Sequence, residues 1–461
     1  MAEIFDKLNQ HLDMNAADQD NRDKIDFNVT QYKVDFNKAK SQFIEFDLAK
    51  ERAAAIKYKV LDELDKYLIE FETNFVSRGG KVIWACNEEE AIREILNIAE
   101  KQHAKLVIKS KSSISDEIHL NEKLEKAGLA VQETSFGEFI HQESNEKSYH
   151  FVHPDINKTK EDIVSFFSKR FGSPLNISAA EITLHVRKLL REKFSKADIG
   201  ITGANFLVAD VGGVALTENE GNALMSVSFP KTHIVIAGIE KVIPTLKDLD
   251  LFWPLLATHG TGQKLTAYNS VVLGPKQEGE IDGTNEMYVI LLDNGRTNLL
   301  GKVEQRRALS CIHCGACLNA CPVYRTIGGE AYHTTYSGPI GAVITPYLKG
   351  LEGFDNLSFA SSLCGKCSEV CPVKINLHEL LLFNRKDAVL NKHTSLKERA
   401  LMLGLKTFMI NRKYLDWVSS KTKNKLLKTF FSKIWGPSRE LPVVKEKSFK
   451  QLWEERHDPK Q

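Results

Sequence analysis

The chain reads CIHCGACLNACP at residues 311–322 and CGKCSEVCP at residues 364–372, and these two runs hold seven of its eight cysteines. The first run has the C-x2-C-x2-C-x3-C-P spacing that is typical of bacterial ferredoxins. The first three thiolates of such a run bind three irons of one cubane, whereas the fourth thiolate points away and binds the other cluster. The sequence therefore predicts two iron–sulfur clusters that share ligands crosswise between the two runs.

The crosswise rule assigns a complete set of four thiolates to a first [4Fe-4S] cluster. These four ligands are Cys311, Cys314, Cys317 and Cys371. The second cluster receives only three cysteines, which are Cys321, Cys364 and Cys367. Ser361 occupies the position at which a full second run would have its first cysteine. We expect the fourth iron of this cluster to bind Ser361 or an exogenous ligand, or to be absent, which would make the second cluster [3Fe-4S].

Zinc and disulfide bonds are the alternatives for clustered cysteines. Four thiolates also suit a structural zinc ion, but zinc sites usually pair two separated C-x2-C motifs. Disulfide frameworks suit small secreted proteins, and no secretory signal precedes these cysteines. The spacing therefore favours iron–sulfur clusters. Cys86 stands alone at the end of an apolar run, and we expect it to be a small buried residue.

Length and composition indicate a soluble protein of several domains. The 461 residues are enough for about two to four domains, and the formal net charge of +2 favours neither nucleic acid nor a membrane surface as a partner. The N-terminus, MAEIFD, lacks a basic segment followed by an apolar one, and no stretch approaches the roughly 18 apolar residues of a membrane span. We expect a cytoplasmic protein.

The sequence pattern divides the chain into four parts. Residues 1–78 have helical apolar spacing and few breakers, which predicts an N-terminal helical arm. In residues 79–300 short β-branched runs alternate with helical segments, which predicts an α/β domain around a mostly parallel sheet. Residues 301–384 place the cysteine runs within helical segments, which predicts an all-helical two-cluster ferredoxin domain. Residues 385–461 form a basic helical C-terminal region.

The α/β prediction depends on continuous apolar strands that are each followed by a helix. The predicted strands cover residues 81–86, 106–108, 129–131, 205–209, 233–237, 270–273 and 287–292. We expect the first strand to be buried, with Asn87 as the N-cap of the next helix because Glu90 follows three residues later. Another helix is predicted over residues 115–127.

Two segments of the α/β part hold candidate catalytic residues. DVGGVALTENEGN at residues 210–222 places Glu218 and Glu220 beside glycines after an apolar strand. Ligand sites of α/β sheets form where strands end, but acids in a tight turn also cap backbone amides. His259 is the third candidate, because the glycines of THGTG at residues 258–262 permit close backbone approach. Without a full G-x-G-x-x-G pattern, nucleotide binding has little support.

The C-terminal region is strongly basic. Its basic residues are Lys397, Arg399, Lys406, Arg412, Lys413, Lys421, Lys423, Lys425, Lys428 and Lys433, against Glu398 and Asp416. One interpretation is a solvated helix face whose apolar side packs on the cluster domain. The other is a docking surface for an acidic partner or for the inner face of the membrane as a peripheral contact. Nucleic acid is not expected, because no recognisable binding fold surrounds these residues.

Three segments of the α/β part resemble the lactate-utilisation (LUD) domain family. They are KSKS at residues 109–112 leading into Glu117 and Asn121, the segment 203–222, and GIEK at residues 238–241. With the cysteine runs after them and the segment from WGP at residues 435–437 to Trp453, the chain is similar to the iron–sulfur subunits of L-lactate oxidation systems. The resemblance implies a sheet like that of CoA transferases and ribose-phosphate isomerases.

The resemblance also implies electron transfer during oxidation of L-lactate to pyruvate, alongside two further lactate-utilisation subunits and an unidentified electron acceptor. Lactate releases two electrons, whereas a cubane accepts one at a time, so two neighbouring clusters suit this reaction. No flavin fingerprint is visible in the chain. A transferase-like enzyme that acts through Glu218 or Glu220, with clusters for structure or sensing, is the alternative function.

Overall fold

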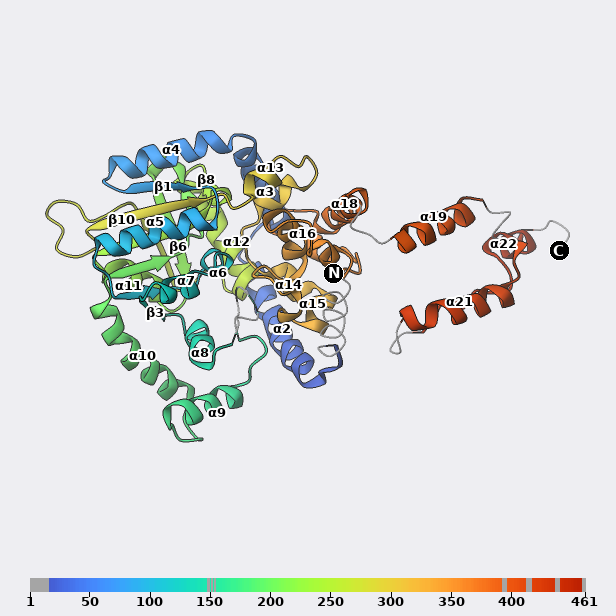
Figure 1. The fold of residues 1–461 in the computed structure, drawn as a ribbon, viewed down its shortest axis with the longest axis horizontal. Coiled ribbons are helices and arrows are strands. Elements are labelled where there is room, and N and C mark those ends of the chain that lie inside the picture. Colours follow the sequence, from blue (N-terminus) through green and yellow to red (C-terminus); the bar gives the residue numbers. More distant parts are fainter. Residues whose placement is uncertain are drawn as a thin grey trace. The chain divides into compact units, whose positions relative to one another are not determined.

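The computed structural model describes residues 16–146, 150, 152, 155–391, 396–411, 417–435 and 440–457. The chain forms two units, Met1–Ala388 and Val389–Gln461, each of which is described by itself. The first unit contains both sheets and the cysteine runs, whereas the second contains the helices at the red end of the colour scale (Figure 1). The predicted boundaries within the first unit stay a prediction.

Within the described residues, three helices precede the first strand. They are α2 (Gln19–Lys40), α3 (Phe46–Asp62) and α4 (Leu64–Ser77). Phe71 and Phe75, one helical turn apart on α4, are fully buried and stack on each other, and they belong to the same apolar core as the sheet. The N-terminal segment is therefore helical over its described residues, and α4 packs on the sheet.

The larger sheet has six strands, and every pairing in it is parallel. In spatial order the strands are β1 (Lys81–Ala85), β10 (Glu286–Leu292), β7 (Thr232–Gly238), β4 (Ile199–Thr202), β2 (Leu106–Lys109) and β3 (Ala130–Glu133). All seven residues of β7 are buried, as expected for an inner strand of a parallel sheet covered on both faces. Because the strands are parallel, their carboxyl ends meet at one edge of the sheet.

A second sheet of four strands lies in the same unit. Its order is β8 (Val242–Ile243), β5 (Phe206–Val208), β6 (Gly213–Glu218) and β9 (Tyr268–Val272). β5 and β6 form an antiparallel pair, as do β6 and β9. The first strand of this sheet in the sequence, β5, follows β4 of the larger sheet, and β6 ends at Glu218. The predicted turn with Glu218 and Glu220 therefore lies at the end of β6.

Helices connect the strands of the α/β part. They are α5 (Glu88–Lys101), α6 (Ser113–Glu117), α7 (Leu120–Lys126), α8 (Phe136–Ser144), α9 (Lys160–Phe171), α10 (Ala179–Lys196), α11 (Asn222–Ser228), α12 (Leu249–Thr261) and α13 (Arg296–Leu300). Asn87 is the N-cap of α5, as predicted, because its Oδ1 accepts a hydrogen bond of 2.9 Å from the Glu90 amide.

Three details of the strand and helix predictions are wrong. Cys86 is exposed, and the strand before it is not buried: β1 is an edge strand in which Trp84 is 47% exposed. An apolar sequence does not show whether its strand has neighbouring strands on both sides or lies at the edge of the sheet. The helix predicted over residues 115–127 is split into α6 and α7, because His119 between them adopts a positive φ of 51°.

After Leu292 every element of the described residues is helical, and the prediction of an α/β part followed by a helical cysteine-bearing part is confirmed. The cysteine-bearing part contains the 3₁₀ segment η4 (Gln305–Ser310) and the helices α14 (Ala316–Ala320), α15 (Pro322–Ile327), α16 (Gly338–Leu348), α17 (Lys366–Glu369) and α18 (Leu377–Leu390). The predicted likeness of the sheet to CoA transferases stays a prediction.

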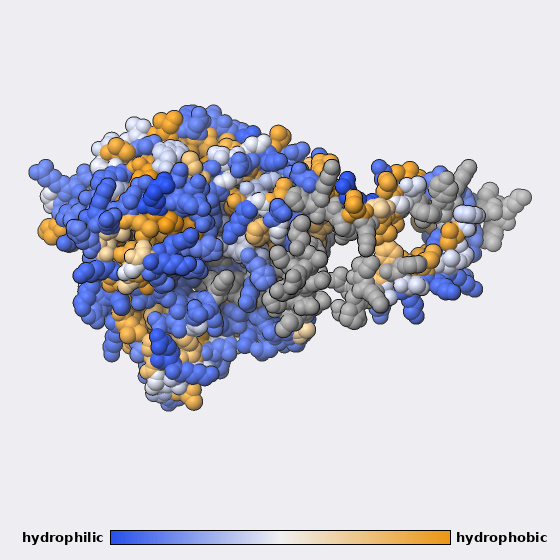
Figure 2. All heavy atoms as spheres, in the orientation of Figure 1, coloured by the Kyte–Doolittle hydropathy of each residue, from blue (hydrophilic) through white to orange (hydrophobic). Residues whose placement is uncertain are grey.

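In its described residues the second unit contains helices α19 (Leu396–Ile410), α21 (Ser420–Trp435) and α22 (Phe449–Arg456). Met402, Leu403 and Ile410 of α19 are each more than 60% exposed, and Figure 2 shows apolar residues at the surface of this unit. Arg412, Lys413 and Asp416 lie outside the described residues, as do the side chains of Lys397, Glu398 and Lys433. No described helix is long and apolar enough to cross a membrane. The role of the basic surface stays a prediction.

A buried ionic cluster, formed by Glu117, Arg296 and Glu240, joins the ends of three strands of the larger sheet. The Arg296 guanidinium lies 2.8 Å from Glu117 Oε2 and 2.7 Å from Glu240 Oε2, and all three side chains are less than 5% exposed. The hydroxyl of Tyr336, from the cysteine-bearing part, donates a hydrogen bond of 2.7 Å to Glu117. Gly238 makes room for this cluster, because a Cβ there would lie 2.1 Å from Glu240 Oε2. The ionic cluster therefore links the sheet to the cysteine-bearing part.

The ionic cluster gives a stability prediction. Arg296→Met removes the shared cation and leaves two carboxylates buried without it, so we expect the free energy of unfolding to fall by about 3–5 kcal/mol. Arg306→Met is the control, because its guanidinium is 35% exposed and pairs with the more exposed Asp62, and the expected loss is about 0–1 kcal/mol. Urea unfolding followed by tryptophan fluorescence measures both. Equal losses for the two variants would contradict the structural role of Arg296.

Candidate functional site

Four cysteines from the two runs line one small cavity. They are Cys311, Cys314, Cys317 and Cys371, and the other walls are mostly apolar side chains such as Ile340 and Leu377. The loop that precedes α14 supplies Cys311 and Cys314, α14 itself supplies Cys317, and Cys371 follows α17. The structure therefore brings together the four residues that the crosswise rule assigns to the first cluster. Their ligation stays a prediction.

Backbone amides point at the sulfur atoms of both runs. The amide of His313 donates to Cys311 Sγ at 3.3 Å, and the amide of Ile375 donates to Cys371 Sγ at 3.4 Å. The amide of Tyr324 donates to Cys321 Sγ at 3.5 Å. Such N–H donors stabilise negative charge on sulfur, and hydrogen bonds to the sulfurs are among the factors that set cluster potentials. The loops are therefore shaped to hold thiolates.

The same cysteines are poorly suited to being thiolates unless a cation accompanies them. Burial raises the pKa of Cys311 to about 12, and the neighbouring Cys371 raises it further. Burial also raises the pKa of Cys317, with additional contributions from Cys311 and Cys314. Iron bound at the centre of the group would supply the positive charge that permits all four to ionise. The donor set, four thiols with backbone amides directed at sulfur, fits an iron–sulfur cluster.

The three cysteines predicted for the second cluster also lie near one another. Burial raises the pKa of Cys367 to about 11, and both Cys321 and Cys364 contribute to the increase. Cys364 is exposed, whereas Cys367 is buried, so this group is more open to solvent than the first. Cys367 of the second group contributes to the raised pKa of Cys317 of the first group. The two groups therefore lie close to each other.

Ser361 occupies the position in its loop that Cys311 occupies in the first loop. The Leu363 amide donates to Ser361 Oγ at 3.1 Å, just as the His313 amide donates to Cys311 Sγ. The two donors share a positive φ, 55° for Leu363 and 56° for His313, which is uncommon for residues other than glycine. Gly315 and Gly365 follow with φ values of 78° and 79°. The backbone therefore repeats, and the serine replaces the first cysteine of the repeat.

Two buried lysines of α3 lie close to the first cysteine group. Lys57 is 1% exposed, and its Nζ donates to the Glu240 carbonyl at 2.6 Å. Burial lowers the pKa of Lys57 to about 8, whereas the nearby Glu240 and Cys311 act in the opposite direction. Lys50 is 6% exposed and donates to the Glu369 carbonyl at 2.9 Å. Neither ammonium forms an ion pair with a carboxylate of the described residues, so a negatively charged cluster would add to the attraction that Glu240 and Asp47 provide.

A larger, polar cavity of about 320 Å³ lies between the sheet and the first cysteine loop. Its lining comes from the segments that follow β2, β4, β7 and β10, together with the turn after β6 and the residues from Ile312 to Cys314. This is the edge at which the carboxyl ends of the parallel strands meet, which is where α/β proteins bind ligands. The charged lining residues are Lys111, Glu218, Glu220, Glu240, Lys241 and Arg296, and the His313 imidazole also lines the cavity.

The candidates Glu218 and Glu220 both line this cavity. The two oxygens of Glu218 accept hydrogen bonds from the Ala223 and Leu224 amides at 2.8 and 2.9 Å, so this carboxylate caps α11. Both hydrogen bonds that Glu220 accepts go to Oε2, from the Phe136 amide and from Asn222 Nδ2, each at 2.9 Å. Burial raises the pKa of Glu220 above its usual value, and the neighbouring Glu218 raises it further. Glu220 is thus the candidate with an oxygen left for a ligand.

The candidate His259 is not among the residues that line the cavity. Its ring is fully buried, stacks on Phe46 and meets the edge of Phe36, with both ring centroids at 5.4 Å. Its Nδ1–H donates to the Leu255 carbonyl at 2.7 Å. Burial lowers the pKa of His259 to about 4. These contacts suit a neutral histidine that packs α12 against the N-terminal helices.

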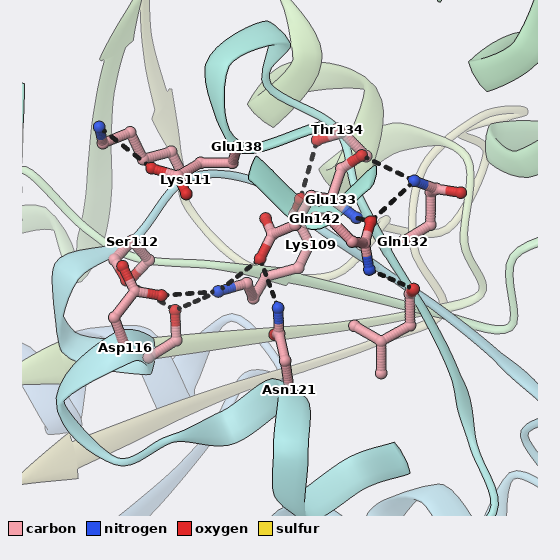
Figure 3. Close-up of polar contacts among 12 residues, drawn as sticks. Lys109, Lys111, Ser112, Asp116, Asn121, Gln132, Glu133, Thr134, Glu138 and Gln142 are labelled. Carbon is pink, nitrogen blue, oxygen red and sulfur yellow. Dashed lines mark hydrogen bonds and ion pairs between the residues drawn. The ribbon is translucent and has the colours of Figure 1, made fainter. Parts of the chain in front are cut away.

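A second buried charge network stands beside the cavity, at the ends of β2 and β3 (Figure 3). The Lys109 ammonium lies 2.9 Å from Glu133 Oε1 and 3.1 Å from Asp116 Oδ1, and Asn121 donates to Glu133 at 2.6 Å. Burial raises the pKa of Glu133 to about 7, although Lys109 opposes this shift. The network holds the segment after β2, and the next lysine, Lys111, pairs with Glu138 at 3.2 Å at the cavity wall.

The cationic side of the site is absent from the sequence-based predictions. They assign no role to Lys50 or Lys57, and they include Lys111 and Lys241 only as parts of a resemblance. A signal was present for the α3 pair, because Lys50 and Lys57 are seven residues apart on the face that also buries Ala53 and Val60. Two lysines on an apolar helix face require a buried partner.

Comparisons with known proteins match both parts of the first unit. Residues 68–292 match the LUD domain family, and residues 307–375 match the 4Fe-4S dicluster domain family. The second match confirms the prediction of two iron–sulfur clusters. A crystal structure of a duf162 family protein from Deinococcus radiodurans matches with a TM-score of 0.28 and 12% identity, covering 50% of this chain and 98% of that one.

Several curated relatives are much more similar in sequence. Proteins named lactate utilization protein B from Bacillus thuringiensis (strain Al Hakam), Bacillus cereus (strain AH187) and Bacillus anthracis (strain A0248) are each 42% identical to this chain over 380 residues. The matched region is 82% of this chain and 80% of each relative.

The repeated loop gives a prediction for the second cluster. Ser361→Cys supplies a fourth thiolate at the repeat position, so we expect about eight iron atoms per chain in anaerobically purified protein and a changed EPR signal of the second cluster. Ser362→Cys, the exposed neighbouring position, is the control and should leave both properties as in the wild type. An S361C protein with about seven irons and an unchanged signal would show that residue 361 does not reach the cluster.

The buried lysines give a prediction for the first cluster. Lys57→Met removes a positive charge close to Cys311, so we expect the reduction potential of the first cluster to fall, because the more negative reduced form loses electrostatic stabilisation. Lys59→Met on the same helix is exposed and should leave the potential unchanged. EPR-monitored redox titration measures both variants, and an unaltered or higher potential in K57M would contradict this role.

Proposed function

This chain belongs to the lactate utilization protein B family, and from that membership we propose that it transfers electrons in the oxidation of L-lactate to pyruvate. It acts as one subunit of a complex with two further lactate-utilisation subunits. When bound, the two clusters take up the two electrons of this oxidation one at a time. The chain's own residues hold the clusters, set their electrostatic surroundings and position them side by side.

One observation carries the proposal: the two cysteine groups adjoin, and together they span from a polar cavity to the protein surface. Cys314 of the first group lines the cavity at the sheet edge. Cys317 lies near Cys367 of the second group, and Cys364 of that group is exposed. An electron that enters near the cavity can therefore leave near the surface without crossing a long stretch of protein.

The charges around the two groups differ, and they favour electron uptake by the inner group. Lys50 and Lys57 place positive charge beside the inner group, which favours its reduction. Around the outer group, the Lys366 ammonium already pairs with Glu369 at 2.7 Å. The inner group is thus built to accept electrons and the outer group is accessible to an acceptor.

The transferase-like alternative receives less support from the cavity. A carboxylate nucleophile needs an oxygen free to attack, but both oxygens of Glu218 are held by backbone amides at the start of α11. Glu220 keeps one oxygen for a ligand, while its other oxygen accepts hydrogen bonds from the Phe136 amide and from Asn222 Nδ2. A purely structural role for the clusters would also not require the two cysteine groups to lie next to each other.

Anaerobic reduction by lactate tests the proposed function. We expect lactate to reduce both clusters, seen by EPR, only when the two partner proteins are present. Cys314→Ala should abolish reduction of the first cluster and lower the iron content by one cluster, because it removes a ligand of the complete set. Clusters that stay oxidised in the reconstituted complex, together with acyl-transfer activity of the isolated chain, would support the alternative instead.

A further inference from the structure

The polar cavity has features that electron transfer alone does not require. It holds about 320 Å³, which is far more than the roughly 10–15 Å³ that a single buried water needs. Three of its lining segments follow β2, β4 and β7, and the loop with His313 and Cys314 closes it on the side of the first cysteine group. A pocket of this kind at the edge of a parallel sheet is the expected place for a small-molecule ligand.

Lys241 is the cation of this cavity that lacks a partner. Lys111 pairs with Glu138 and Arg296 pairs with Glu117 and Glu240, whereas the Lys241 ammonium makes no ion pair or hydrogen bond with any described residue. Burial lowers its pKa, although Glu240 and Cys311 oppose that shift. A partly buried ammonium without a partner is costly, and an anionic ligand would offset that cost.

The acids in the lining limit the charge that such a ligand can carry. Glu218, Glu220 and Glu240 all contribute to the wall and would repel a doubly charged phosphate. A monocarboxylate brings one negative charge for Lys241. Glu220, whose Oε1 takes no part in its two hydrogen bonds, can meet a hydroxyl or carbonyl group next to that carboxylate. One unpaired cation and one available acid therefore match a small acid with an oxygen on its second carbon.

We propose that this cavity binds a small 2-hydroxy or 2-oxo monocarboxylate, with its carboxylate on Lys241 and its second oxygen at Glu220. The inference rests on the proposed function for its substrate class and adds that the acid binds to this chain, beside Cys314. A three-carbon acid of this class has six non-hydrogen atoms, so it fits the cavity with several waters. The bound acid and the first cysteine group would then share one wall.

Calorimetric titration of the anaerobically purified, cluster-containing full chain tests the site, with L-lactate, pyruvate and inorganic phosphate as probes. We expect saturable binding of lactate or pyruvate and none of phosphate. Lys241→Met should weaken binding at least tenfold, as expected for the loss of a charge-assisted hydrogen bond, and Lys241→Arg should restore most of it. Lys247→Met, an exposed lysine of the same segment, is the control and should bind as the wild type does.

EPR provides a second readout that is independent of calorimetry. Because Cys314 lines the cavity, pyruvate should alter the EPR signal of the reduced first cluster in the wild type and not in K241M. Absence of binding in the wild type, phosphate binding in place of pyruvate, or equal affinity in K241M would overturn the site. Binding without lactate-dependent reduction in the complex would refute the proposed function and leave the site standing, and reduction without binding would do the reverse.

Discussion

The buried ionic cluster of Glu117, Arg296 and Glu240 is the constraint on which the site depends. Its three members follow three different strands of the parallel sheet, and Tyr336 of the cysteine-bearing part bonds directly to one of them. A charge in this setting is stable only while its partners stay in place. His313, between two cysteines of the first run, has its Nε2 4.0 Å from Glu240 Oε1. The same contacts that close the sheet edge therefore also set the position of the first cysteine loop.

Much of the fold could be predicted from the sequence, because long β-branched runs mark inner strands clearly. Two of the strands that escaped prediction contain glycine where the chain packs closely: a Cβ on Gly200 of β4 would lie 1.9 Å from the Ser226 carbonyl oxygen, and β6 begins at Gly213. The third, β8, has only two residues, which is too short to give a pattern. Glycine lowers the strand signal of a segment although tertiary packing requires it there. The wrong prediction for Cys86 has a related cause, because the local sequence does not show whether a strand lies at the edge of a sheet or how exposed its residues are.

The cysteine groups could be predicted because iron–sulfur ligation imposes a fixed local spacing. The cationic residues could not, because their partners are distant in sequence: Lys57 meets Glu240 across 183 positions, and Arg296 meets Glu117 across 179. The role of Glu218 could not be predicted for a different reason, because the TENEG segment is compatible with either a catalytic turn or a helix cap. The hydrogen bonds from the Ala223 and Leu224 amides show that Glu218 caps a helix. Cysteine spacing in the sequence therefore predicts the candidate ligands, whereas the charged residues around them can be found only in the three-dimensional structure.

The unequal exposure of the two cysteine groups affects how oxidation would damage the clusters. Cys364 is open to solvent and a side chain added at Gly365 would meet nothing, whereas Cys314 and Cys317 are buried. Dissolved oxygen and peroxide therefore reach the outer cluster first. A cluster at the buried inner group would keep its iron for longer, so the two sites would lose iron one after the other.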